Sequence, residues 1–158
     1  MTRSGADLTL LLLGGFRVLA ESGAAELAAL GHPDVRPAHD FALRSIAAGA
    51  ESASELARRM SVTKQAAAKT IAVLEEREYV TREPDPGDRR RTRLRVTLRG
   101  EELLRHGDEV FDGLRHQWEK QVGVAAVRDL EAALRALVGS RSIRFDTPGG
   151  AGGDPDVG

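Results

Sequence analysis

Lys64, Gln65, Ala66 and Lys69 are close together in the chain, and their side chains can bind nucleic-acid bases. A lysine can donate to guanine, a glutamine can pair with adenine, and an alanine methyl can touch thymine. Thr63 precedes them and suits a helix N-cap, because its hydroxyl can accept from a backbone N–H two or three residues on. The first two turns of such a helix are where a recognition helix reaches base edges. An ordinary surface helix with a solvated polar face is the alternative.

A second group of candidates is the run Arg89, Arg90 and Arg91. It directly follows residues 83–88, EPDPGD, which are dense in turn formers. A hairpin tip with three guanidinium groups suits the narrow, negatively charged minor groove of DNA or the phosphates beside it. Asp88 is near enough in the chain to orient one of the arginines by a charge-assisted hydrogen bond. A solvated surface loop is the alternative.

The elements that position these two groups change from helix to strand along the chain. Ser52 and Glu55 have the spacing of a capping box and predict a helix over about 53–60. A second helix carries the base-binding candidates, with apolar residues at helical spacing on its other side. Residues 79–82 and 92–96 have the composition of strands. The order of helix, turn, helix and β-ribbon is the plan of a winged helix-turn-helix.

At these residues the sequence resembles the MarR (multiple antibiotic resistance regulator) family of bacterial transcription factors. The matching pieces are SELARRMSVTKQAAAKTIAVLEEREYVTREPDPGDRRR and the trailing VTLRG, within about residues 37–100. The resemblance implies a homodimer that binds a palindromic operator in double-stranded DNA. It also implies that Thr63, Gln65 and Lys69 are on the recognition helix and that Arg90 is in the wing.

Three residues depart from the family pattern. Ser61 occupies a turn position where the family often has glycine, and Glu78 stands where a glycine usually ends the recognition helix. If Glu78 is left-handed, it costs roughly 1 kcal/mol more than glycine would. Gly87 replaces a frequent basic residue of the wing, which removes one expected interaction with phosphate or minor groove.

The composition fits one soluble, mainly helical domain with a local basic patch. The chain has 158 residues, of which 41% are hydrophobic and 30% charged, and a net charge of −1. Residues 51–100 hold 12 Lys or Arg and 8 Asp or Glu, a net of +4, and the remainder holds 11 and 16, a net of −5. A basic patch on an acidic body gives an oriented electrostatic footprint for nucleic acid.

Helices on both sides flank the predicted DNA module. Their apolar stripes exceed what that small module can cover, and in the family such terminal helices interlock two subunits. An intramolecular bundle is the alternative. The fold class predicted is mainly α with a small β-ribbon, a winged helix-turn-helix flanked by N- and C-terminal dimerisation helices. The predicted parts are the winged helix-turn-helix at about 37–98, dimerisation helices at about 7–31 and 99–139, and a disordered tail at 146–158.

Other chemistry finds little support in the sequence. There is no cysteine, which excludes disulfides and thiol sensing, and there is no nucleophile elbow, P-loop or dinucleotide fingerprint. We therefore expect neither an enzyme nor a cofactor. His39 and His106 are noted because some relatives sense zinc near the dimer hinge, but no histidine pair has helical metal-site spacing, so we expect no metal. The apolar run at 8–13 is too short to span a bilayer, which predicts a cytoplasmic protein.

Two functional hypotheses remain from the sequence. The first is a dimeric transcriptional regulator, a repressor whose DNA affinity is set by a small molecule bound between the dimer helices and the DNA lobes. The second is a winged-helix protein-interaction module that never binds DNA. The basic tip at 89–91, together with Lys64 and Lys69, favours the first, because a protein-binding wing does not need these cations.

Overall fold

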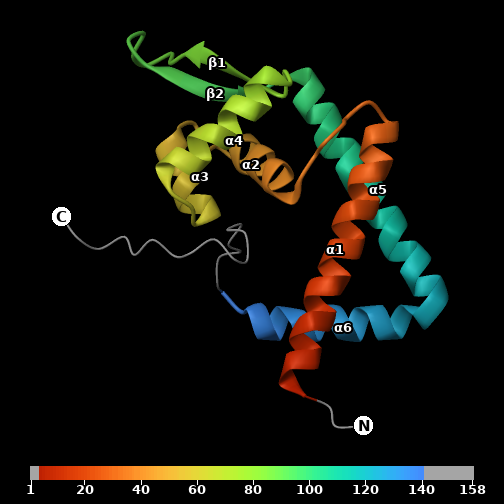
Figure 1. Cartoon of the computed structure of the whole chain (residues 1–158). Helices are drawn as coiled ribbons and strands as arrows, with labels where there is room; N and C mark the ends of the chain where they lie inside the picture. The colour runs from red at the N-terminus through yellow and green to blue at the C-terminus, as the bar shows by residue number, and fades with distance from the viewer. Residues whose placement is uncertain (1–3, 141–158) are drawn as a thin grey trace.

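The computed structural model describes residues 4–140, which form a mainly helical fold with one antiparallel two-stranded sheet (Figure 1). The fold class predicted from the sequence is confirmed. The predicted disorder of 146–158 lies outside the described residues. The elements, in chain order, are α1 (Gly5–Ala29), α2 (Pro37–Ala47), α3 (Ala53–Met60), α4 (Lys64–Glu76), β1 (Val80–Pro84), β2 (Thr92–Val96), α5 (Leu98–Val122) and α6 (Val124–Val138).

Local signals in the sequence explain where the central helices begin. Ser52 Oγ accepts from the Glu55 N–H at 3.2 Å, so Ser52 caps α3 as predicted. The reciprocal half of the capping box differs, because the Glu55 carboxylate accepts from the Glu51 N–H at 2.9 Å instead of from Ser52. Thr63 caps α4 in the predicted way, with its hydroxyl accepting from the Ala66 N–H at 3.1 Å.

The first strand begins at Val80, one residue later than predicted. Tyr79 lies in the turn that closes the recognition helix, since its N–H donates to the Leu74 carbonyl at 2.9 Å. Its side chain is 1% exposed, so Tyr79 belongs to the core of the fold. From Val80 to Pro84 the strand then pairs with β2, so that Val80 faces Val96 and Pro84 faces Thr92.

Two residues that depart from the family pattern are left-handed, as the missing glycines suggested. Ser61 has φ 54° between α3 and α4, and Glu78 has φ 63° after α4. Each costs roughly 1 kcal/mol relative to glycine. A residue distant in the chain stabilises the left-handed conformation at Glu78, because the Thr97 hydroxyl donates to the Glu78 carbonyl at 2.5 Å.

A single core ties α2, α3, α4 and the ribbon into one lobe. Apolar residues from each element are almost completely buried in it, and Leu103 and Val110 of α5 extend it toward the flanking helices. Its largest fully buried apolar side chains are those of Leu27, Leu43, Leu56, Met60, Ile71, Leu74, Tyr79 and Leu103. This core presents the opposite face of α4 to solvent.

The flanking helices α1, α5 and α6 extend away from this lobe (Figure 1). α1 packs along α5, and Gly23 permits the close approach, since a Cβ at that position would lie 2.5 Å from the Phe111 ring. Their predicted apolar stripes are only partly covered, because Leu103, Val110 and Val127 are buried whereas several others are exposed. The exposed members include Leu8 at 59%, Phe16 at 54% and Leu137 at 63%.

α1 has nearly the bounds predicted for the first flanking helix, at about 7–31. The helix continues through Gly14 and Gly15, so its apolar surface is longer than the run at 8–13. By length and composition alone α1 could cross a membrane, with a mean hydropathy of 1.4. The run at 8–13 is short on its own, but it lies within this longer helix, so length alone does not decide whether α1 meets a membrane.

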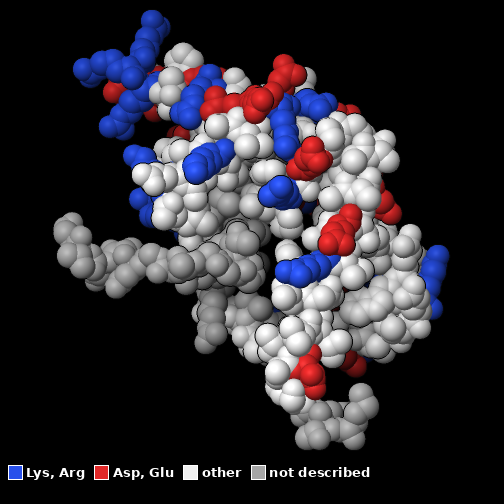
Figure 2. All heavy atoms as spheres, viewed as in Figure 1, with Lys and Arg blue, Asp and Glu red and all other residues white. Residues whose placement is uncertain are grey.

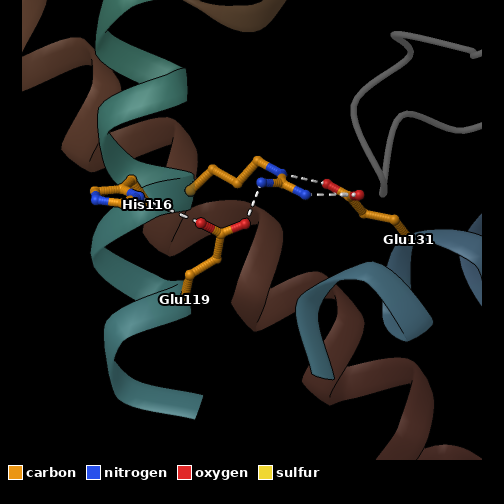
Figure 3. Close-up of polar contacts among 4 residues, drawn as sticks. His116, Glu119 and Glu131 are labelled. Carbon is orange, nitrogen blue, oxygen red and sulfur yellow. Dashed lines mark hydrogen bonds and ion pairs between the residues drawn. The ribbon is translucent and has the colours of Figure 1, made fainter. Parts of the chain in front are cut away.

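α6 is attached to α5 by an ion-pair network beyond the Gly123 elbow, where φ is 96° (Figure 3). Arg115 donates from Nε to Glu131 Oε1 at 2.6 Å and from Nη2 to Glu131 Oε2 at 3.1 Å, which is a bidentate pair between the two helices. Arg115 also contacts Glu119, whose other oxygen is 3.3 Å from His116 Nδ1. The hydrogen bonds to Arg115 hold the pKa of the Glu131 carboxyl below its usual value.

We expect Arg115→Met to loosen α6, because methionine cannot form the bidentate pair although its side chain also extends along the helix surface. Limited proteolysis should then cut near Gly123 faster than in the wild type. Arg128→Met is the matched control, since Arg128 is an exposed arginine of α6 whose ion pair, with Asp129 at 3.8 Å, lies within the same helix. Equal cleavage rates in both variants would show that Arg115 does not hold α6.

Candidate nucleic-acid interface

The first two turns of α4 present the predicted base-binding residues to solvent. Thr63, Lys64, Gln65, Ala66 and Lys69 are all exposed. Ala67, Ile71 and Leu74 on the other side are at most 1% exposed and hold α4 on the core. The helical spacing therefore divides the two faces as the sequence predicted.

The wing tip is a tight turn built by its own aspartates. Asp85 Oδ1 accepts from the Gly87 N–H at 2.8 Å, and the Asp85 N–H donates to the Arg91 carbonyl at 2.9 Å. Asp88 Oδ1 accepts from the Arg90 N–H at 3.0 Å and lies 3.3 Å from Arg90 Nε. Asp88 thus orients Arg90 in the way the sequence suggested. The Arg90 side chain still projects, with 92% of its surface exposed.

Arg89 and Arg91 are exposed beside Arg90, and neither makes an ion pair within residues 4–140. The same holds for Lys64 and Lys69 in that range. The arginines of the strand β2, in contrast, are in ion pairs. Arg95 lies 3.6 Å from Glu83, and Arg93 lies 3.9 Å from Glu51. Figure 2 shows Lys and Arg side chains projecting together at the end of the β1–β2 ribbon, at the upper left.

One ion pair joins the recognition helix to the wing, and sequence reasoning missed it. Arg82 Nε on β1 lies 3.1 Å from Glu75 Oε1 on α4. The ion pair joins β1 to α4 at the surface of the lobe. Sequence spacing alone could not reveal it, because it depends on how the chain turns between Glu76 and Val80.

The histidines noted for metal do not gather with other ligands. Among residues 4–140, no group of three or more His, Cys, Asp or Glu side chains is placed to hold a metal ion. His39 Nδ1 instead accepts from the Arg36 N–H at 3.1 Å at the start of α2. Burial and the nearby Arg77 and Arg36 hold the pKa of His39 below its usual value. His106 is hydrogen-bonded to His32.

An apolar cavity of about 310 Å³ lies between α1, α2 and α5. Its volume is at the lower end of the range for small-molecule sites. Arg36 and Asp40 are the charged residues along its wall. The apolar lining includes Phe16, Leu19, Leu27, Val35, Phe41 and Phe111.

This arrangement of exposed helix, paired ribbon and basic tip defines a winged helix-turn-helix protein. The model of the MarR family matches residues 41–91, which cover most of α2, all of α3, α4 and β1, and the tip of the wing. The chain carries the MarR-family winged helix-turn-helix, and the resemblance predicted from the sequence is confirmed. The family is one of transcriptional regulators and not of enzymes.

Solved structures share the fold over most of the chain. RV1404 from Mycobacterium tuberculosis is 22% identical, with a TM-score of 0.69, covering 89% of this chain and 97% of that one. A mutant of MarR from E. coli is 23% identical, with a TM-score of 0.64, covering 87% and 98%. A mutant of MepR from S. aureus, bound to an oligodeoxyribonucleotide, is 17% identical, with a TM-score of 0.57, covering 83% and 95%. No curated protein sequence matches.

Proposed function

We propose that the protein is a dimeric, sequence-specific DNA-binding transcriptional regulator. The observation that carries this proposal is the set of unpaired cations on α4 and the wing. Lys64, Lys69, Arg89 and Arg91 are exposed without an ion pair in the described chain, although the chain as a whole carries a net charge of −1. Unpaired cations on an exposed helix and a projecting hairpin suit phosphates and base edges.

The two cationic groups have different tasks in this proposal. Lys64, Gln65, Ala66 and Lys69 read base edges in the major groove, with Thr63 at the helix start beside a phosphate. Arg89, Arg90 and Arg91 bind the minor groove or its phosphates, and Asp88 orients Arg90. The MepR structure shares the fold and is bound to an oligodeoxyribonucleotide, which supports DNA binding as the function of this fold.

The basic surface can be tested on DNA directly. Binding to the DNA upstream of the protein's own coding region should be tighter than to random DNA, and both should weaken steeply as salt rises. A salt series by gel shift or fluorescence anisotropy measures this. Failure to bind either DNA even at low salt would favour the protein-interaction module.

The flanking helices support a homodimer. α1 exposes Leu8, Leu11 and Phe16, and α6 exposes Leu137, in numbers unusual for a solvated helix surface. A second copy would cover these stripes, and two-fold symmetry would place two recognition helices on a palindromic operator about one helical turn apart. The apolar surface of α1 is then a protein interface and not a membrane span, which agrees with a cytoplasmic location.

Light scattering of the full chain at micromolar concentration should therefore give about twice the chain mass of 17.0 kDa. Phe16→Glu should shift the mass toward the monomer, since it places a charge on the exposed stripe of α1. Glu26→Gln is the control, because Glu26 is an exposed residue of the same helix outside the apolar stripe. A monomeric wild type would refute the homodimer.

We also propose that a small molecule in the apolar cavity changes the affinity for DNA. The cavity is lined by α1 and α5 on one side and α2 on the other, so an occupant would touch both the flanking helices and the DNA lobe. A dimer bound to its operator blocks other proteins from that DNA and so represses transcription. A gel-shift screen of apolar compounds would identify the effector.

A further inference from the structure

His32, Tyr79 and His106 form a chain of hydrogen-bonded rings between the DNA lobe and the long helix α5. His32 Nδ1 lies 3.0 Å from the Tyr79 hydroxyl oxygen, and His32 Nε2 lies 3.0 Å from His106 Nδ1. His32 is 1% exposed, in the loop that follows α1. Tyr79 follows the recognition helix directly, so the rings connect α1, α4 and α5 at one point.

Hydrogen bonds from two arginines to backbone carbonyls surround these rings. Arg99 of α5 donates to the Arg77 carbonyl at 3.2 Å and to the Gly31 carbonyl at 3.1 Å, and its guanidinium lies 5.1 Å from the Tyr79 ring centre. Arg77 donates to the Asp34 carbonyl at 2.8 Å. We call the three rings, Arg77 and Arg99 the histidine junction. It fixes the loop after α1 and the end of α4 on α5.

The number of protons on the two imidazoles decides whether these hydrogen bonds can form. With both rings neutral, each hydrogen bond has one donor and one acceptor. A single extra proton is also compatible, because a doubly protonated His32 can donate to both Tyr79 and His106. With both rings charged, His32 Nε2–H and His106 Nδ1–H face each other at 3.0 Å and no hydrogen bond is possible between them. The second proton therefore forces the rings apart.

The surroundings resist protonation of His32. Burial is the largest cause that lowers the pKa of His32, followed by the positive charges of Arg99 and His106, while Glu102 opposes them. From the α4–β1 side the ring meets Tyr79, whose own pKa is raised by burial, so the phenol is neutral. Arg77, also a cation, donates to the carbonyl of Pro33 next to His32, and the carboxylates of Asp34, Glu76 and Glu78 lie around the same surface pocket.

We propose that the histidine junction is a proton switch that lowers DNA affinity in mild acid. The inference rests on the proposed DNA-binding function. Protonation of both histidines removes one of the links between α5 and the end of the recognition helix and leaves those from Arg99 and Thr97. The two recognition helices of a dimer are then held less firmly at the spacing of the operator. Protonation of exposed histidines would add positive charge and raise DNA affinity. A fall in DNA affinity in mild acid therefore distinguishes the switch from this general charge effect.

The same groups make stability depend on pH in a defined direction. The folded pKa of His32 lies below its ordinary value of 6.5, so the unfolded chain binds more protons between the two values. The contribution of His32 to stability is therefore complete above 6.5 and is lost as the pH falls toward the folded pKa. His39 acts in the same direction, so variants are needed to separate the two.

The test measures the affinity of the full chain for a labelled duplex of its own upstream DNA, by fluorescence anisotropy at constant ionic strength. Between about pH 8 and about pH 5.5 the wild-type affinity should fall about threefold to tenfold, the size expected for the net loss of one hydrogen bond. His106→Gln should largely remove this fall, because glutamine can bond to His32 and does not titrate. His116→Gln, at an exposed histidine of the same helix, should keep it.

A second measurement needs neither a variant nor DNA. The ring signals of His32 and His106, followed by NMR over the same pH range, should change together and should move the Tyr79 signals. The ring signals of His116, which lies outside the junction, are the reference in the same spectra. Titration of His106 alone, or an unchanged pH dependence in His106→Gln, overturns the switch. Absence of DNA binding at both pH values instead overturns the proposed function, while the NMR titration still decides whether the junction opens.

Discussion

Gly100→Ala is expected to destabilise the folded protein severely. A Cβ at Gly100 would lie 2.3 Å from the Tyr79 carbonyl oxygen and 2.7 Å from Val96 Cγ1. The first clash is with backbone, and that carbonyl already accepts from the Thr97 N–H at 3.0 Å, so it cannot move without breaking the start of α5. Overpacking of this kind costs about 1–3 kcal/mol and more where backbone must shift, so we expect a loss of about 3 kcal/mol.

Gly113→Ala in the same helix is the matched control. No heavy atom of the described chain lies within 4 Å of a Cβ placed there, so the new methyl meets open space. Alanine in a helix interior is favoured over glycine by about 0.5–1 kcal/mol, so this variant should be slightly more stable than the wild type. Denaturant unfolding at one fixed protein concentration compares the two, since dimerisation adds to apparent stability. Equal midpoints would contradict the close packing at Gly100.

The sequence was sufficient for those parts of the fold that depend on local chemistry. Thr63 and Ser52 cap their helices through hydrogen bonds to residues three positions away, so their spacing carries the information. The apolar period of α4 placed Lys64 and Lys69 on the solvent side for the same reason. The aspartates of the wing act over two residues, which is why the sequence alone could predict that Asp88 orients one of the three arginines, and the structure shows that it is Arg90.

Interactions between segments far apart in the chain could not be predicted from local sequence spacing. The His32–His106 bond joins residues 74 positions apart, and it depends on how α1 packs along α5. The Arg82–Glu75 pair depends on the left-handed turn at Glu78. His32 itself carries a weak local signal, since it stands between Gly31 and Pro33 in a loop, where histidine is usually solvated. Its burial comes from tertiary packing alone.

Removing side chains from the recognition helix and from the wing should weaken DNA binding in different ways. Gln65 and Lys69 lie one turn apart on the exposed face of α4. If they read base edges, Gln65→Ala or Lys69→Ala should cost roughly 1–3 kcal/mol on the operator. The loss on random DNA should be smaller, because random DNA offers no matching base edge. Specificity, expressed as the ratio of the two affinities, should therefore fall.

Arg90→Ala should weaken operator and random DNA more nearly alike. Its side chain is held by Asp88 yet 92% exposed, which suits an interaction with phosphate or minor groove that carries little sequence information. The plot of log affinity against log salt should flatten by about one unit for every phosphate that each subunit no longer neutralises. Arg128→Ala removes the same charge from α6, away from the DNA lobe, and should change neither quantity.

All four variants are to be measured on both DNAs over one salt series, with circular dichroism and light scattering as controls for folding and dimerisation. An unchanged affinity and salt slope in Arg90→Ala would show that the wing does not bind DNA. Normal binding by Gln65→Ala and Lys69→Ala as well would remove the helix from the interface. The exposed face of α4 would then be better explained as a protein-binding surface, because nothing else in its burial or capping requires an interaction with DNA.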